Sequence, residues 1–145
     1  YLNFIGDVYG VPKQDRVARI EHWLDVLELA GAVASPIQSY SHGMKQKIVL
    51  IAALLPAPRV MVLDEPLVGL DPRAAHQLKE LMRSHCDGGG TLFFSTHIME
   101  VAEKLCDRIG IINKGRLVAC GTMDELKKMN AEQSLENIFL EITET

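Results

Sequence analysis

The stretch that most constrains this chain runs from residue 59 to residue 72 and reads RVMVLDEPLVGLDP. Its first five residues are mostly apolar and follow Pro56 and Pro58, which is typical of a short strand buried on both faces of a parallel sheet. Asp64 and Glu65 stand where this strand must end, and open α/β sheets bind ligands at the carboxyl ends of their strands. A pair of carboxylates at such a position suits Mg²⁺ and a base for an attacking water.

The residues around this stretch predict alternating helices and strands. Asp71 and Pro72 are expected to open a helix as its N-cap and first helical residue, and residues 91–95 read as a second buried strand. Further helices are predicted at residues 1–11, 13–29, 42–55, 98–105 and after the capping residues Thr122 and Ser134, with a β-hairpin over 108–113 and 116–120. Gly31 is expected to stop the second helix, whose polar face, Arg16 included, is expected to be solvated.

Composition excludes several classes of function. The net charge of −4, without basic clusters, argues against a nucleic-acid partner. The three cysteines lack metal-site spacing and predict reduced thiols, and no apolar run reaches membrane-spanning length. The chain does not begin with Met and carries no basic leader, so we expect it to be a piece of a longer protein.

Two further motifs accompany the acidic strand end. Residues 40–46 read YSHGMKQ and open a helix, where exposed backbone amides form an anion site, and Ser95-Thr96-His97 follows the second strand. Taken singly, the three features have plain structural interpretations. The acidic strand end could be a polar loop, the start of the helix an ordinary cap, and the histidine a surface residue. Together with VMVLDEP, these two motifs resemble the nucleotide-binding domain of ABC transporters. The resemblance covers almost the whole chain, but only the second part of that domain.

The resemblance implies roles for individual residues. The segment VMVLDEP resembles the Walker B motif, so Asp64 would organise Mg²⁺ through its water shell and Glu65 would polarise the attacking water. His97 matches the H-loop histidine, which reaches the γ-phosphate, so Glu65 and His97 are the expected catalytic residues. Asp71 falls in the segment that resembles the D-loop, which crosses the interface of the domain dimer.

Residues 40–46, YSHGMKQ, resemble the ABC signature motif, usually LSGGQ, which binds ATP held by the opposite subunit. Ser41, Gly43 and Met44 are therefore expected to bind ATP in trans. Tyr40 replaces Leu, and His42 replaces the first Gly of the motif. We expect His42 to be a spectator that points away from the phosphate.

The implied fold is a partial P-loop NTPase (RecA-like) α/β core with parallel strands, a helical signature subdomain and a C-terminal β-hairpin with helices. The expected boundaries are residues 1–58 for the helical subdomain and 59–145 for the C-terminal part of the core. The phosphate-binding Walker A loop and the glutamine loop have no counterpart in these residues. Because the Walker A loop supplies most of the affinity for nucleotide in this fold, we predict that the isolated chain does not hydrolyse ATP.

The function implied is that of an ABC transporter ATP-binding subunit with ATP and Mg²⁺ as cofactors. Its expected partners are a second nucleotide-binding domain and a transmembrane permease, at the cytoplasmic face of the membrane. Two alternatives stay open: a non-transport ABC ATPase of the chromosome or DNA-repair type, and a non-enzymatic half-domain that binds a partner. The transported substrate cannot be read from this sequence.

Overall fold

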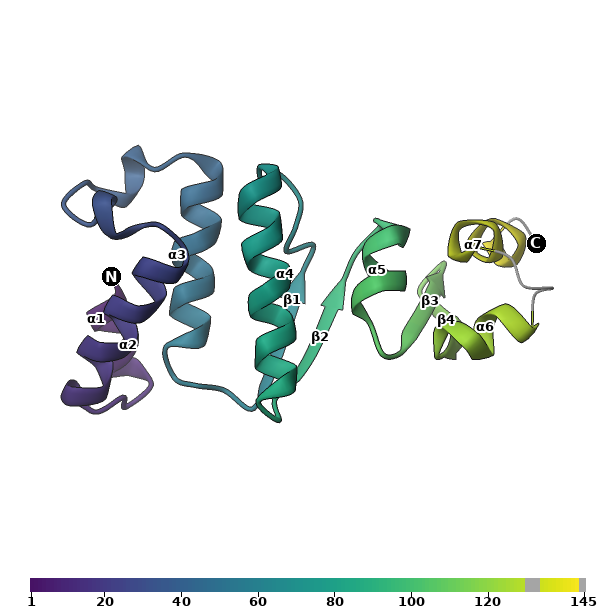
Figure 1. Cartoon of the computed structure of the whole chain (residues 1–145), viewed down its shortest axis with the longest axis horizontal. Helices are drawn as coiled ribbons and strands as arrows, with labels where there is room; N and C mark the ends of the chain where they lie inside the picture. Colours follow the sequence, from purple (N-terminus) through teal and green to yellow (C-terminus); the bar gives the residue numbers. More distant parts are fainter. Residues whose placement is uncertain (130–133, 144–145) are drawn as a thin grey trace. The chain divides into compact units, whose positions relative to one another are not determined.

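The computed structural model describes residues 1–129 and 134–143 and shows a mixed α/β chain (Figure 1). The chain divides into two compact units, Tyr1–Ser95 and Thr96–Thr145, and each is described by itself. The parallel strand pair of the first unit and the antiparallel hairpin of the second confirm the predicted fold class. The boundary expected near residue 58 stays a prediction.

The first unit contains the helices and strands that carry the acidic stretch. Its helices are α1 (Leu2–Val8), α2 (Lys13–Val26), α3 (His42–Leu54) and α4 (Pro72–Asp87). Short 3₁₀ turns at Ala30–Ala32 and Ile37–Ser39 connect α2 to α3. The strands β1 (Val60–Asp64) and β2 (Thr91–Ser95) pair in parallel.

Helix α2 ends earlier than the sequence predicted. Its last residue is Val26, and Glu28 adopts a left-handed backbone with φ of 55°. The Leu29 amide then donates a hydrogen bond to the Leu24 carbonyl (2.8 Å), which closes the helix end in the manner of a Schellman motif. Glu28, rather than Gly31, therefore ends the helix, because backbone hydrogen bonds stabilise its left-handed conformation.

Arg16 corrects the prediction that the polar face of α2 is solvated. The residue is 7% exposed, and its guanidinium donates to the carbonyls of Asn3 and Val11, both at 3.0 Å. It also pairs with Asp7 at 2.8 Å. A buried cation of this kind requires hydrogen-bond partners, and α1 together with Val11, which follows it, supplies them. Arg16 therefore ties α1 to α2.

The sheet of the first unit has two strands, with Asp64 opposite Ser95 at their carboxyl ends. Met61 is buried, but Val60, Val62 and Phe93 are 61%, 72% and 66% exposed. The prediction that β1 is buried on both faces is therefore wrong for this chain. Strands in parallel sheets are buried when helices cover both faces, and the described residues cover only one.

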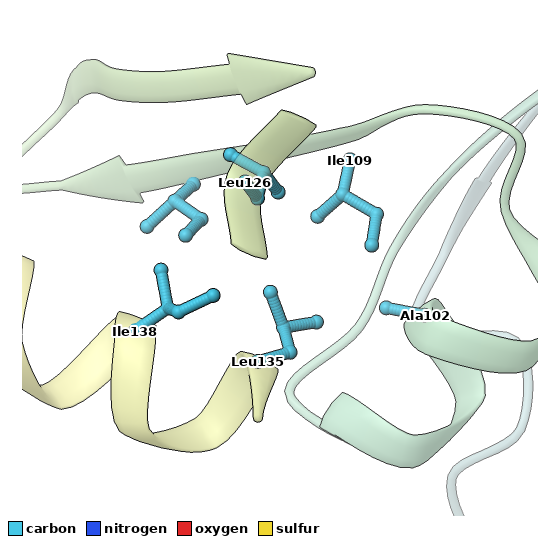
Figure 2. Close-up of a cluster of buried hydrophobic side chains, with 6 residues drawn as sticks. Ala102, Ile109, Leu126, Leu135 and Ile138 are labelled. Carbon is cyan, nitrogen blue, oxygen red and sulfur yellow. The ribbon is translucent and has the colours of Figure 1, made fainter. Parts of the chain in front are cut away.

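The second unit packs a β-hairpin against three helices. The hairpin strands are β3 (Ile109–Asn113) and β4 (Arg116–Gly121), and the helices are α5 (Met99–Leu105), α6 (Met123–Met129) and α7 (Leu135–Thr143). Its core gathers six buried apolar residues from α5, β3, α6 and α7 (Figure 2). Thr122 and Glu125 form the predicted capping box, with reciprocal bonds of 2.8 and 3.2 Å. In the described part of the chain, no helix is both long and apolar enough to cross a bilayer.

Candidate functional site

The carboxyl ends of β1 and β2 bring a carboxylate and a hydroxyl together. The Ser95 hydroxyl donates a hydrogen bond to Asp64 Oδ1 (2.5 Å) and accepts one from the backbone amide of Glu65 (3.0 Å). Ser95 thus joins the last residue of one strand to the turn that follows it. The parallel register makes this possible, because it places Asp64 and Ser95 side by side at the same edge of the sheet.

Glu65 leaves the strand through a strained backbone. Its φ is 44°, in the left-handed region that glutamate seldom occupies, and its carbonyl accepts a hydrogen bond from the Val68 amide at 3.2 Å. Such a conformation costs about 1–3 kcal/mol and persists where surrounding contacts impose it. Here the bond from the Glu65 amide to Ser95 and the turn to Val68 hold it, so the direction of the Cα–Cβ bond of Glu65 is fixed.

The N-terminus of α3 carries the residues predicted to bind phosphate. Ser41 is the N-cap, and its hydroxyl accepts a hydrogen bond from the Met44 amide at 3.3 Å, as predicted. Gly43 and Met44 lie in the first turn of this 13-residue helix and are half-buried. The amides of a first helical turn and the positive end of the helix dipole favour an anion.

Two contacts join the start of α3 to the loop that follows Glu65. The Gln46 side-chain amide donates to the Pro66 carbonyl at 2.7 Å. A Cβ atom built on Gly43 would lie 3.9 Å from Leu70 Cδ2, so this loop runs directly beside the first turn of α3. The first unit therefore brings the signature-like turn and the acidic strand end into one connected arrangement.

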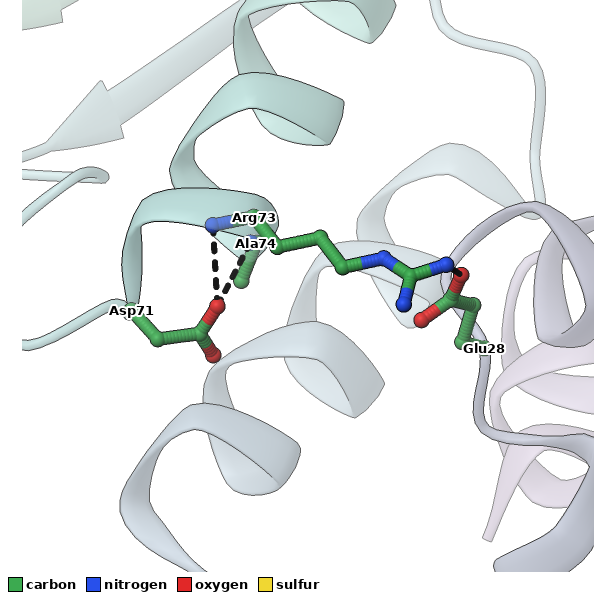
Figure 3. A network of polar contacts seen from close by, with 4 residues as sticks. All are labelled: Glu28, Asp71, Arg73 and Ala74. Carbon is green, nitrogen blue, oxygen red and sulfur yellow. Dashed lines mark hydrogen bonds and ion pairs between the residues drawn. The ribbon is translucent and has the colours of Figure 1, made fainter.

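Asp71 is the N-cap of α4, as predicted, with Pro72 as the first helical residue. Its Oδ1 accepts hydrogen bonds from the amides of Arg73 (3.0 Å) and Ala74 (2.9 Å). Arg73 also reaches Glu28, the left-handed residue at the end of α2, at 2.5 Å (Figure 3). The hydrogen bond from the Ala74 amide has the largest effect and, together with the Arg73 amide and the charge of Lys47, holds the pKa of Asp71 below its ordinary value of 3.8, although desolvation, the second-largest effect, acts to raise it.

This cap predicts a pH-dependent contribution to stability. Because the folded pKa of Asp71 is lowered, the ionised cap stabilises the chain above the unfolded pKa, and this contribution is lost as pH falls through the folded pKa. Asparagine can still accept the amide bonds but does not titrate. We therefore expect the stability advantage of the wild type over Asp71→Asn to be constant near neutrality and to shrink in acid. Urea midpoints from about pH 7 to about pH 2 measure it, and a pH-independent difference would contradict it.

The donor set at the strand end fits the way proteins hold Mg²⁺. No group of three or more histidine, cysteine or acidic side chains in the described residues is arranged as a metal cage. Mg²⁺ is commonly bound by one or two carboxylates together with waters and substrate phosphates. Asp64 is exposed and has a second carboxylate oxygen beside the one bonded to Ser95. Asp64 is therefore the residue that could hold Mg²⁺ here, together with waters and substrate phosphates.

His97 belongs to the second unit, where it is exposed and precedes α5. Its catalytic role stays a prediction. Two residues of the arrangement were missed by sequence reasoning, namely Ser95, which was read only as a strand end, and Gln46, which was read only as part of the motif. The available signals were the position of Ser95 in STH and that of Gln46 in SHGMKQ. Their partners, however, lie 31 residues away for Ser95 and 20 residues away for Gln46.

Comparisons with known proteins give one matching family model and several similar ATP-binding proteins. A family model described as "AAA domain, putative AbiEii toxin, Type IV TA system" matches residues 27–103, more than half of the chain. The ABC-type transporter ATP-binding protein EcsA of Bacillus subtilis is 32% identical over 145 residues, which cover 99% of this chain and 59% of that protein. The daunorubicin resistance ATP-binding protein DrrA3 of Streptomyces coeruleorubidus is 34% identical, over 97% of this chain and 44% of that protein.

A solved structure, titled "Structure of ATP binding subunit of ABC transporter", matches with a TM-score of 0.92 and 33% identity, over 97% of this chain and 60% of that chain. The fold is therefore that of a P-loop NTPase. Within that class, the chain belongs to the family of ABC transporter ATP-binding proteins. The chain spans between 36% and 59% of the length of curated relatives such as these.

Proposed function

We propose that this chain is the signature-bearing part of an ABC transporter ATP-binding subunit, which couples ATP binding and hydrolysis to transport. The observation that carries the proposal is the arrangement in the first unit. Asp64, Ser95 and the Glu65 backbone form a hydrogen-bonded strand end. The capped N-terminus of α3 is joined to the loop leaving it through Gln46. Such an arrangement offers a partial Mg²⁺ site and an anion-binding helix end.

Within this proposal each residue has a distinct task. Asp64 would hold Mg²⁺ through water, and Ser95 keeps that carboxylate in place. Glu65 would accept the proton of the attacking water, which is the work of a general base. His97 would contact the γ-phosphate. Bound Mg²⁺ would neutralise charge on the β- and γ-phosphate oxygens.

Ser41, Gly43 and Met44 would bind the γ-phosphate of ATP held by a second nucleotide-binding domain. Asp71 would contact that domain while it caps α4. In such a head-to-tail pair, the helix end and the acidic strand end of one chain serve opposite nucleotide sites. A transmembrane permease at the cytoplasmic face of the membrane completes the proposed assembly. One relative, DrrA3, is named for resistance to daunorubicin, which makes export a reasonable direction to test.

The proposal is tested with the extended protein, by which we mean this chain preceded by its native upstream sequence. We expect the extended protein to hydrolyse ATP in the presence of Mg²⁺, and the 145-residue chain alone to be inactive. Phosphate release measured with and without Mg²⁺ decides both points. Turnover by the chain alone would contradict the expectation of inactivity. An inactive extended protein that lacks a phosphate-binding loop would favour a non-enzymatic interaction module.

A further inference from the structure

His42 stands where the signature motif of the family has glycine, and the structure shows what its side chain contacts. It is the first residue of α3, directly after the Ser41 cap. Its imidazole ring lies against Gly69 in the loop between Glu65 and Asp71. A Cβ atom built on Gly69 would lie 2.9 Å from Cδ2 and 3.0 Å from Nε2 of the ring. The ring therefore occupies the space that any larger residue at position 69 would need.

This contact extends the two contacts already described between α3 and the same loop. Gln46 binds the Pro66 carbonyl near the start of the loop, and Gly43 faces Leu70 near its end. His42 meets the loop between them, at Gly69, whose φ of +75° marks the turn of the chain. The loop thus follows the first turns of α3 along most of its length. Of these residues, His42 presents the largest rigid side chain.

We propose that His42 is a positioning residue whose ring sets the spacing between the signature-like turn and the loop that follows Glu65. At Gly69 the loop can approach α3 only as far as contact with the ring allows, and a glycine at position 42 would remove that limit. The consequence for catalysis rests on the proposed function, since the loop joins Glu65 to Asp71. The ring acts by its volume and planarity, so a phenyl ring should replace it.

The first test measures the spacing without any enzymatic activity. The Val68 amide, bonded to the Glu65 carbonyl at 3.2 Å, reports opening of the loop by hydrogen exchange. In the 145-residue chain, His42→Gly should raise exchange at Val68 several-fold, whereas His42→Phe should leave it near the wild-type rate. The Gly89 amide, bonded to the Cys86 carbonyl at 2.9 Å beyond α4, is the internal control and should not change. Equal acceleration at both amides, or none at Val68, would overturn the proposal.

The second test measures MgATP turnover of the extended protein, normalised to the native fraction. His42→Gly should lower it about tenfold or more, as a small misplacement in a reacting site can do, and His42→Phe should restore most of it. Equal loss in both variants would assign the role to the ring nitrogens and overturn the proposal.

Gly69→Ala completes a double-mutant cycle. An alanine at position 69 is strained by the positive φ whether residue 42 is histidine or glycine, so this strain cancels in the cycle. Only the clash between the alanine Cβ and the His42 ring differs between the two backgrounds. We therefore expect Gly69→Ala to be less damaging in the His42→Gly background, both to exchange at Val68 and to turnover. Additive effects would overturn the proposal. If the wild-type extended protein shows no turnover, the proposed function fails, while the exchange measurements still decide the role of His42.

Discussion

Replacing Glu65 by glutamine is expected to lower MgATP turnover of the extended protein by about one hundred to ten thousand fold, the range that general bases contribute. Glutamine has nearly the size of glutamate but cannot accept a proton from water. The bond that Glu65 makes to Ser95 runs through its backbone amide, so the substitution leaves that bond in place. ATP affinity should be retained, because the change removes a base and not a phosphate ligand.

The matched control is Glu80→Gln, the same substitution on the exposed surface of α4 in the same unit. It should leave turnover unchanged. Single-turnover phosphate release and ATP binding, measured on all three proteins, separate chemistry from affinity. If Glu65→Gln kept more than about a tenth of wild-type turnover, Glu65 would not be the general base. If it lost ATP binding instead, its role would be structural.

Local sequence signals predicted the ends of several helices correctly. The cap at Asp71 with Pro72 after it, the cap at Ser41, and the box formed by Thr122 and Glu125 all appear as expected. In each case the partners lie within three residues, so neighbouring side chains and amides decide the structure. The parallel pairing of β1 with β2 also followed from apolar segments separated by a helical pattern.

Features that depend on distant partners could not be read from the sequence. Arg16 looked like one more polar residue on a helix, and only the packing of α1 on α2 buries it with Asp7 and two carbonyls. In that case the tertiary arrangement, rather than local propensity, selects the environment of the side chain. Glu28 gave no sign of a left-handed helix end, because glutamate seldom adopts that conformation and the bonds that close the turn join backbone groups only.

The residues of the candidate site likewise divide into those that local sequence signals predicted and those that depend on distant partners. The carboxylates Asp64 and Glu65 were evident from the end of an apolar segment, because strand ends are where parallel sheets bind ligands. Ser95 could not be assigned to them, since its role follows from the register that sets it opposite Asp64. His42 was expected to point away from the phosphate as a spectator. Its ring lies against Gly69, a contact that a glycine at position 42 could not make.

The largest expected effect on stability comes from Leu126→Ala in the second unit. Leu126 is fully buried in the cluster that includes Ile109, Leu135 and Ile138 (Figure 2). Truncating a buried leucine removes its transfer free energy and leaves a cavity, at a cost of about 2–5 kcal/mol. A unit of this small size has little stability in reserve, so the loss should unfold much of it at ambient temperature.

Leu117→Ala provides the matched control, because Leu117 lies on β4 of the same unit but is 64% exposed. Its cost should stay within about 0.5 kcal/mol, as for most surface substitutions. Amide NMR signals of β3 and β4, followed through urea unfolding, report on this unit directly, whereas the single tryptophan, Trp23, lies in the other. A Leu126→Ala protein as stable as the Leu117→Ala protein would mean that the cluster does not hold the unit together. Loss of the hairpin signals in Leu126→Ala alone would show that the hairpin depends on the side chain that α6 contributes to the cluster.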